Sequence, residues 1–370
     1  MINEDRLIET FIELVKIDSP SGEEDSMAKE MGKRLRELGG RVEEDSFGNV
    51  IAKFEGSVPP TPDGFGEARE PLLLNAHLDT VEPGRGIKPK VGEVSIETDG
   101  TTILGGDDKA GLAIILEAIT TSKEKNLPHV PLEVVLTRGE EIGLLGAVNL
   151  DYSKITAIKG ASFDGHGPVN NITVTAPGIY TVDVTIIGRS AHAGVEPEKG
   201  ISAIEIASKI ISELKLGRID EETTANIGLI EGGSARNAVA ERVHFKGEAR
   251  SLNSDKLEAH IDHFRDIFQK FDKQYEEATL EIEMTRECEP YNFNDDHPMV
   301  KRILEVCQKL KIKPSLEPTG GAADVNIFNG HGLEVVCVGT GDMDLHTKGE
   351  YLVIKDFIEA ANFAAELMKI

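Results

Sequence analysis

Hydrophobic residues alternate along the first 170 positions between helical spacing and short continuous runs. The run Leu132–Thr137, for example, predicts a strand, and it follows a helical pattern over residues 109–121. Because strands that alternate with helices are typical of an α/β sheet covered by helices, we expect such a sheet here. The expected helices are 3–17, 23–38 and 109–121, and the expected strands are 50–54, 72–74, 132–137 and 158–163. Residues 56–70 are rich in proline and glycine and predict a surface loop.

The pattern changes after Pro177-Gly178. Strands at 180–187, 243–249 and 280–284 and helices at 201–214 and 257–271 form a β-α-β-α-β order. This order predicts a self-contained α+β domain over residues 178–287, inserted into a first domain made of residues 1–177 and 288–370. The returning part of that first domain is expected to hold helices at 299–310 and 357–368 and a strand at 335–338.

Composition narrows the classes of function. A chain of 370 residues with 39% hydrophobic residues fits two globular domains, and its formal net charge of −25 disfavours binding to nucleic acid or anionic membranes. No run approaches about 18 apolar residues, so we expect no membrane span. The start of the chain is acidic, unlike a signal peptide, and the three cysteines form no CxxC motif. We therefore expect a cytoplasmic protein with reduced thiols.

Five polar clusters follow the expected strands or open a helix, where open α/β sheets place ligands. Each has an ordinary explanation on its own: a solvated acid, a helix N-cap or an exposed histidine. Together they supply two histidines and three or four carboxylates, which is the donor set of a two-zinc hydrolase. The clusters are His77-Leu78-Asp79, Gly105–Gly111, Arg138–Gly143, Phe163–Gly167 and Asp344–Tyr351.

Specific motifs in these clusters give the chain a family resemblance. It resembles the M20 family of metallopeptidases, and within it the peptidase T (tripeptide aminopeptidase) branch. The motifs run in family order from residue 75 to residue 351. They are NAHLDTV at 75–81, GGDDKAG at 105–111, RGEEIG at 138–143, FDG at 163–165, GRSAHAG at 188–194, GGSARNAV at 232–239, GEARS at 247–251, PTGGAADVN at 318–326 and LHTKGEY at 345–351.

The resemblance implies a fold and a set of residue roles. It implies a di-zinc hydrolase domain with a mixed sheet and helices on both faces, plus an inserted α+β lid and dimerisation domain. The implied metal ligands are His77 and Asp164 for one zinc, Glu141 and His346 for the other, and Asp107 between them. The implied catalytic residues are Asp79, which orients His77, and Glu140, the general base acting on a metal-bridging water. Co²⁺ or Mn²⁺ would suit the same N and O ligands.

The resemblance extends to the inserted domain. It implies that His192 polarises the scissile carbonyl, in its own subunit or in the partner of a homodimer, and that Asn237 and Arg250 hold the carboxylate of a short peptide substrate. The expected activity is removal of the N-terminal residue from short peptides. Two alternatives stay open: another M20 hydrolase (dipeptidase, carboxypeptidase or amino-acid N-deacylase), or a catalytically silent dimeric binding protein.

Overall fold

The computed structural model describes residues 1–57 and 70–369, so most of the loop expected at 56–70 lies outside the described residues. The chain divides into two compact units. The first unit comprises Met1–Val174, Phe293–Pro318 and Ala323–Ile370, and the second comprises Thr175–Asn292 and Thr319–Ala322. The domain expected at 178–287 therefore lies inside the second unit.

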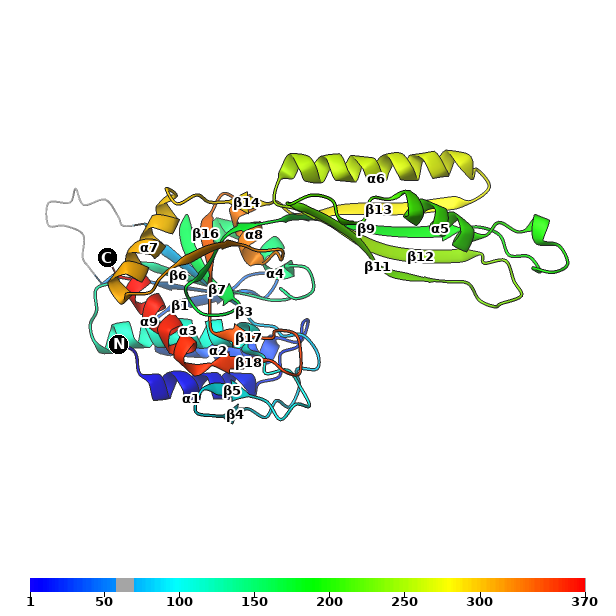
Figure 1. Ribbon diagram of the computed structural model, residues 1–370. Helices are drawn as coiled ribbons and strands as arrows, with labels where there is room; N and C mark the ends of the chain where they lie inside the picture. The colour runs from blue at the N-terminus through cyan, green and yellow to red at the C-terminus, as the bar shows by residue number, and fades with distance from the viewer. Residues whose placement is uncertain (58–69, 370) are drawn as a thin grey trace. The chain divides into compact units, whose positions relative to one another are not determined.

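A nine-stranded mixed sheet forms the centre of the first unit, in the order β1-β2-β6-β3-β7-β16-β8-β14, with β15 paired to β8 (Figure 1). Its strands are β1 Arg41–Glu44, β2 Val50–Phe54, β3 Leu72–His77, β6 Leu132–Thr137, β7 Lys159–Gly165, β8 Asn171–Ala176, β14 Tyr291–Asn292, β15 Ser315–Pro318 and β16 Glu334–Gly339. A smaller sheet has the order β17-β18-β5-β4. It contains β4 Lys90–Val91, β5 Ser95–Glu97, β17 Asp342–Met343 and β18 Tyr351–Val353.

Four neighbouring strands of the large sheet, β6, β3, β7 and β16, run parallel to one another. Every residue of β3 and β6 is buried, which explains why their sequences are mostly apolar and do not alternate with exposed polar residues. Because parallel strands end at the same edge of a sheet, the segments that follow β3, β6, β7 and β16 start side by side. This edge therefore collects the polar clusters of the sequence.

Helices cover the large sheet. Helix α3 is buried along most of its length because it packs against α1, α9 and the strands β3 and β7. Helices α4 and α8 contact each other. Helix α4 also contacts β6, and helix α8 also contacts β16. The helices of this unit are α1 Glu4–Val15, α2 Asp25–Glu37, α3 Gly106–Glu124, α4 Leu145–Val148, α7 Pro298–Leu310, α8 Asp324–Gly330 and α9 Ile354–Leu367, with a 3₁₀ turn η1 at Tyr152–Lys154.

The second unit is an antiparallel sheet in the order β10-β11-β12-β9-β13, with α5 and α6 packed against it. Its elements are β9 Gly178–Ile187, η2 Pro197–Lys199, α5 Ala203–Glu213, β10 Gly217–Arg218, β11 Thr223–Gly232, β12 Arg242–Ser251, α6 Ser254–Gln274 and β13 Thr279–Cys288. The expected β-α-β-α-β order was wrong in omitting β11 and the short β10. Strand β11 has apolar residues at alternate positions only from Ala225 to Leu229, is mostly exposed after Ala225, and contains Gly228, where its register with β12 shifts, so it gave a weak strand signal.

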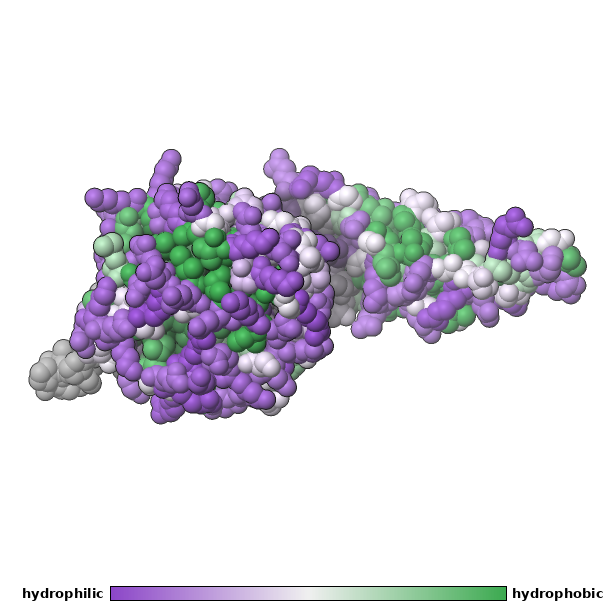
Figure 2. Space-filling model, turned by 90° about the horizontal axis from the view of Figure 1, so that it is seen from below, coloured by the Kyte–Doolittle hydropathy of each residue, from purple (hydrophilic) through white to green (hydrophobic). Residues whose placement is uncertain are grey.

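The surface agrees with the acidic composition. The face seen in Figure 2 is mostly hydrophilic, with smaller hydrophobic areas on each unit. Among the described residues, no helix has the length and apolar content needed to cross a membrane. Cys288, Cys307 and Cys337 are buried and free.

Each unit has its own hydrophobic core, and the two cores share no residue. Phe264 is fully buried in the second unit and Phe11 in the first. Phe264→Ala should therefore lower the unfolding free energy of the second unit by roughly 3–5 kcal/mol and so lower its transition temperature. The transition temperature of the first unit should stay the same. The matched variant Phe11→Ala should do the reverse. Calorimetry on both variants checks this, and a common shift of both transitions would contradict separate cores.

Candidate metal centre

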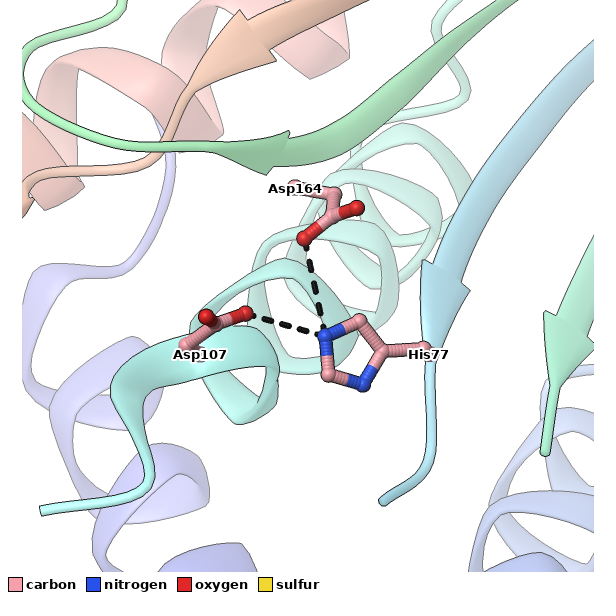
Figure 3. Close-up of side chains that lie close together, drawn as sticks. All are labelled: His77, Asp107 and Asp164. Atoms are coloured by element: carbon pink, nitrogen blue, oxygen red, sulfur yellow. Dashed lines mark hydrogen bonds and ion pairs between the residues drawn. The ribbon is translucent and has the colours of Figure 1, made fainter. Parts of the chain in front are cut away.

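His77, the last residue of β3, lies at the centre of the acidic edge of the sheet. Its Nε2 atom points between two carboxylates, 2.9 Å from Oδ1 of Asp107 and 3.6 Å from Oδ1 of Asp164 (Figure 3). Asp107 comes from the start of α3, and Asp164 comes from β7, the strand next to β3. The imidazole is fixed in this place because the strand that carries it is buried throughout.

The fully buried Asp79 links His77 to the turn that carries Glu140 and Glu141. Its Oδ1 atom lies 3.5 Å from Nδ1 of His77 and accepts the backbone N–H of Glu140 at 3.0 Å. Its Oδ2 atom accepts the hydroxyl of Ser21 at 2.7 Å and the N–H of Glu141 at 3.3 Å. One carboxylate thus orients both the imidazole and the acidic turn.

The same turn is also held from its other side by Glu24, a residue that the sequence did not single out. Its buried carboxylate accepts two N–H groups of Arg138, at 3.1 Å and 2.9 Å, and the backbone N–H of Gly139 at 3.2 Å. The Arg138 guanidinium is therefore engaged by Glu24 rather than by the acidic pair that follows it.

His346 completes a second group of ligand-type atoms. Its Nε2 atom lies 2.9 Å from Oε1 of Glu141 and 3.1 Å from Oδ2 of Asp107. Asp107 therefore presents one oxygen to each imidazole. The ligand-type atoms fall within 4.8 Å of one another in three overlapping groups: His77, Asp107 and Asp164; Asp107, Glu141 and His346; and His77, Glu140 and Glu141.

The charge balance of this cluster favours cations. Burial, together with the negative charge of Asp164, raises the pKa of Glu140 well above its usual value. Burial also raises the pKa of Asp164, and hydrogen bonds to Asp107 and Glu141 raise that of His346 to about 10. Within residues 1–57 and 70–369, no lysine or arginine forms an ion pair with Asp107, Glu140, Glu141 or Asp164. Carboxylate and imidazole groups that lack such partners fit divalent metal ions.

Asp324 is a further buried acid near this cluster. It opens α8, its carboxylate accepts the hydroxyl of Thr137 at the end of β6, and its Oδ1 atom has no hydrogen-bond partner among the described residues. Burial raises the pKa of Asp324 to about 6. The PTGGAADVN motif contains Asp324, but a single acid at a helix start resembles an ordinary N-cap in sequence, which is why it was assigned no role.

The other predicted site residues lie in the second unit. His192 and Asn237 sit on adjacent exposed segments, joined by a hydrogen bond from the N–H of Ala193 to the carbonyl of Asn237 (3.0 Å). Nδ1 of His192 accepts the N–H of Gly194 at 3.2 Å, so a neutral imidazole carries its proton on Nε2.

Arg250 of β12 is already engaged on one side of its guanidinium. Its Nε and Nη2 atoms each lie 2.9 Å from an oxygen of Glu248, and its Nη1 atom donates to the carbonyl of Gly320 at 3.0 Å. A guanidinium has five N–H groups, so these three bonds leave two without a partner in the described part of the chain.

Comparison with known proteins identifies the family. Residues 174–276 match the peptidase dimerisation domain of M20 enzymes, and residues 49–168 match peptidase family M28. Aminopeptidase PepT from Bacillus cereus is 39% identical, with a TM-score of 0.88 over 99% of this chain and 98% of that one. The chain belongs to the M20 family of metallopeptidases. A tripeptidase from Staphylococcus aureus is 36% identical (100% and 98% covered, TM-score 0.91), and YqjE from Bacillus subtilis is 42% identical (100% and 99% covered).

These matches confirm two predictions made from the sequence. The resemblance to the M20 family and its peptidase T branch is confirmed, since Peptidase T from an Exiguobacterium species is also 26% identical over 98% of this chain and 97% of that protein. The fold class is confirmed as well, because the chain combines a mixed α/β domain with a separate dimerisation domain.

The crowding of acids predicts that the metal-free protein is destabilised by its own site. Folding raises the pKa of Asp164, so the folded protein is more stable when this carboxyl group is protonated. That stability is present at low pH and is lost as the pH rises through the pKa of the folded state. Asp164→Asn should therefore raise the melting temperature in chelator at pH 8, with a smaller gain at pH 5, and should reduce the stabilisation that added zinc provides. Thermal melts in chelator and in zinc check this. A lower melting temperature in chelator at pH 8 would contradict it.

Proposed function

We propose that this M20 metallopeptidase is a two-zinc aminopeptidase that releases the N-terminal residue of short peptides. The arrangement of Asp107, with one oxygen toward His77 and the other toward His346, carries the proposal. His77 and Asp164 would hold one ion, Glu141 and His346 the other, and Asp107 both. Zinc suits this mixed N and O donor set, as Co²⁺ and Mn²⁺ also would. The relatives named as an aminopeptidase and a tripeptidase support the choice of substrate.

Glu140 is the general base in this proposal. When bound, the two ions would supply Lewis acidity that polarises the scissile carbonyl and acidifies water. Glu140 takes the proton from the attacking water and returns it to the leaving amine, which requires a carboxylate that is free of metal. Its side chain forms no ion pair within the described residues, and its backbone N–H is fixed by Asp79.

Asp79 orients both His77 and the turn that carries Glu140 and Glu141. Its carboxylate faces Nδ1 of His77, which leaves Nε2 directed to the metal side, and it accepts the backbone N–H groups of the acidic turn. Any displacement of Asp79 would therefore move a ligand and the base together.

The second unit supplies the groups that contact the peptide. His192 donates from Nε2 to the oxygen of the scissile carbonyl, while Asn237 and the two free N–H groups of Arg250 bind the peptide carboxylate. The match to a peptidase dimerisation domain supports a homodimer formed through this unit. In such a dimer His192 serves either its own subunit's site or that of the partner. The three free cysteines fit the reducing cytoplasm.

Variants of the adjacent Glu140 and Glu141 test the assignment of base and ligand. Glu140→Gln removes the basic oxygen and keeps the shape, so it should retain two metal ions per chain while turnover falls by roughly 10²- to 10⁴-fold. Glu141→Gln should instead lose one ion first, and added zinc should restore part of its rate. Metal analysis and rates on the same samples decide this. A metal-depleted Glu140→Gln that zinc rescues would show that the two roles are reversed.

A panel of peptides tests the substrate and the role of Arg250. Free tripeptides should be cleaved faster than N-acetylated peptides, which lack the amine, and faster than amidated peptides, which lack the carboxylate. Arg250→Ala should raise KM for free peptides by tens- to thousands-fold, since a charge-assisted pair contributes about 2–5 kcal/mol. Equal turnover of free and amidated peptides would contradict the role of Arg250, and preference for N-acetylated substrates would indicate an N-deacylase.

Mixed dimers test whether His192 acts across subunits. His192→Ala and His77→Asn should each be inactive alone. If His192 serves the partner, each mixed dimer contains one intact site, and a 1:1 mixture should regain about a quarter of the wild-type activity. Mass spectrometry verifies subunit exchange. Exchanged dimers that stay inactive would place His192 in its own subunit's site or outside the chemistry.

A further inference from the structure

Glu350 lies behind the metal centre and contacts the segment that carries Asp107. Its carboxylate is buried and accepts the backbone N–H groups of four consecutive residues. Oε2 accepts from Leu104 at 2.7 Å and Gly105 at 2.9 Å, and Oε1 accepts from Gly106 at 2.7 Å and Asp107 at 3.2 Å. One side chain thus fixes the backbone path from residue 104 to residue 107.

This segment has little room to adjust. Gly105 adopts a left-handed conformation with φ of +71°, which favours glycine. A Cβ atom at Gly106 would come within 1.9 Å of Oδ1 of Asp342 and 3.1 Å of Oε1 of Glu350. The backbone therefore packs directly on two buried carboxylates, and a change at Glu350 would be transmitted to Asp107.

Glu350 also belongs to the loop that carries His346. That loop turns tightly, with φ of +60° at His346, and the N–H of Glu350 donates to the carbonyl of Thr347 at 3.1 Å. The hydroxyl of Thr347 in turn donates to the carbonyl of Asp344 at 2.8 Å. A single carboxylate therefore joins the segment of Asp107 to the loop of His346, although these ligands lie far apart in the sequence.

We propose that Glu350 is a positioning residue of the metal centre, which holds Asp107 and His346 at the separation that lets both contact one ion. The inference rests on the proposed function, in which these two residues share an ion. Glu350 is not among the proposed ligands of either ion or the groups proposed to contact the peptide. Its effect on the reaction passes through the distance between Nε2 of His346 and Oδ2 of Asp107, which is 3.1 Å.

A purely structural role, as an anchor of α3, is the competing explanation. Glu117 in the same helix provides a matched control because it is equally buried and also anchors the helix. Its carboxylate accepts two N–H groups of Arg6, at 2.7 Å and 2.9 Å, and the backbone N–H of Asn3 at 2.8 Å. It has no contact with a proposed ligand in the described residues.

The experiment compares Glu350→Gln with Glu117→Gln. The amide of Glu350→Gln puts an N–H₂ group where the carboxylate accepted N–H donors, so the segment of Asp107 must move. Competition with a chelator should show about 10- to 100-fold weaker binding of one ion, as is typical when a group that orients metal ligands is removed. The visible spectrum of the Co²⁺-loaded protein should change. Glu117→Gln should lower the melting temperature but keep wild-type zinc affinity and the wild-type cobalt spectrum.

Several outcomes decide the inference. Wild-type zinc affinity and cobalt spectrum in Glu350→Gln would overturn it, whatever the melting temperature. If Glu350→Gln fails to fold, Glu350→Asp keeps the charge but shortens the reach, and the same criteria apply to it. Equal loss of zinc affinity in Glu117→Gln would show a general effect of helix anchoring and would also overturn it. A wild-type protein that binds only one ion would instead contradict the proposed function, and this inference with it.

Discussion

The first unit concentrates negative charge at one edge of its sheet. Within the described residues no lysine or arginine forms an ion pair with the ligand-type carboxylates there, and N–H groups and imidazoles contact this edge instead. Asp79 accepts backbone N–H groups from the acidic turn, and Glu350 accepts them from the segment of Asp107. A backbone N–H group offsets part of a carboxylate's charge without occupying the space beside its neighbours. The arrangement therefore stays strongly negative and rigid, which are the two properties that a site for divalent cations needs.

Sheet topology explains why this edge can gather so many groups. The four parallel strands β6, β3, β7 and β16 end together, and each is followed at once by a segment that contributes to the cluster or to its support. Helix α3 fits beneath them because its small and apolar residues pack between α1 and α9. The unit thus uses a largely buried sheet and helix to hold polar groups that would otherwise repel one another.

The sequence predicted what depends on local pattern and missed what depends on distant contacts. Strand β6 was predicted with its observed bounds because an apolar run buried on both faces is distinctive, whereas the exposed β11 carried no such pattern. Family motifs indicated the ligand-type residues, and the structure brings those of the first unit together. Glu24 was missed, and Glu350 appeared only as part of the LHTKGEY motif with no role assigned, because each accepts backbone N–H groups more than a hundred residues away and an amide donor leaves no trace in the sequence. The roles of His192, Asn237 and Arg250 rest on resemblance alone.

The order of the strands has a consequence for the synthesis of this protein. Strand β16 lies between β7 and β8 in the sheet, although it follows both in the chain by well over a hundred residues. A chain still on the ribosome has made β7 and β8 but lacks the strand that joins them, so their facing edges stay open until residues 334–339 emerge. His346 emerges later still. Most of the second unit, which lies between residues 175 and 292, can meanwhile fold by itself. The enzyme's most crowded region is therefore assembled last, and a truncated translation product would expose unpaired strand edges to the folding machinery of the cell.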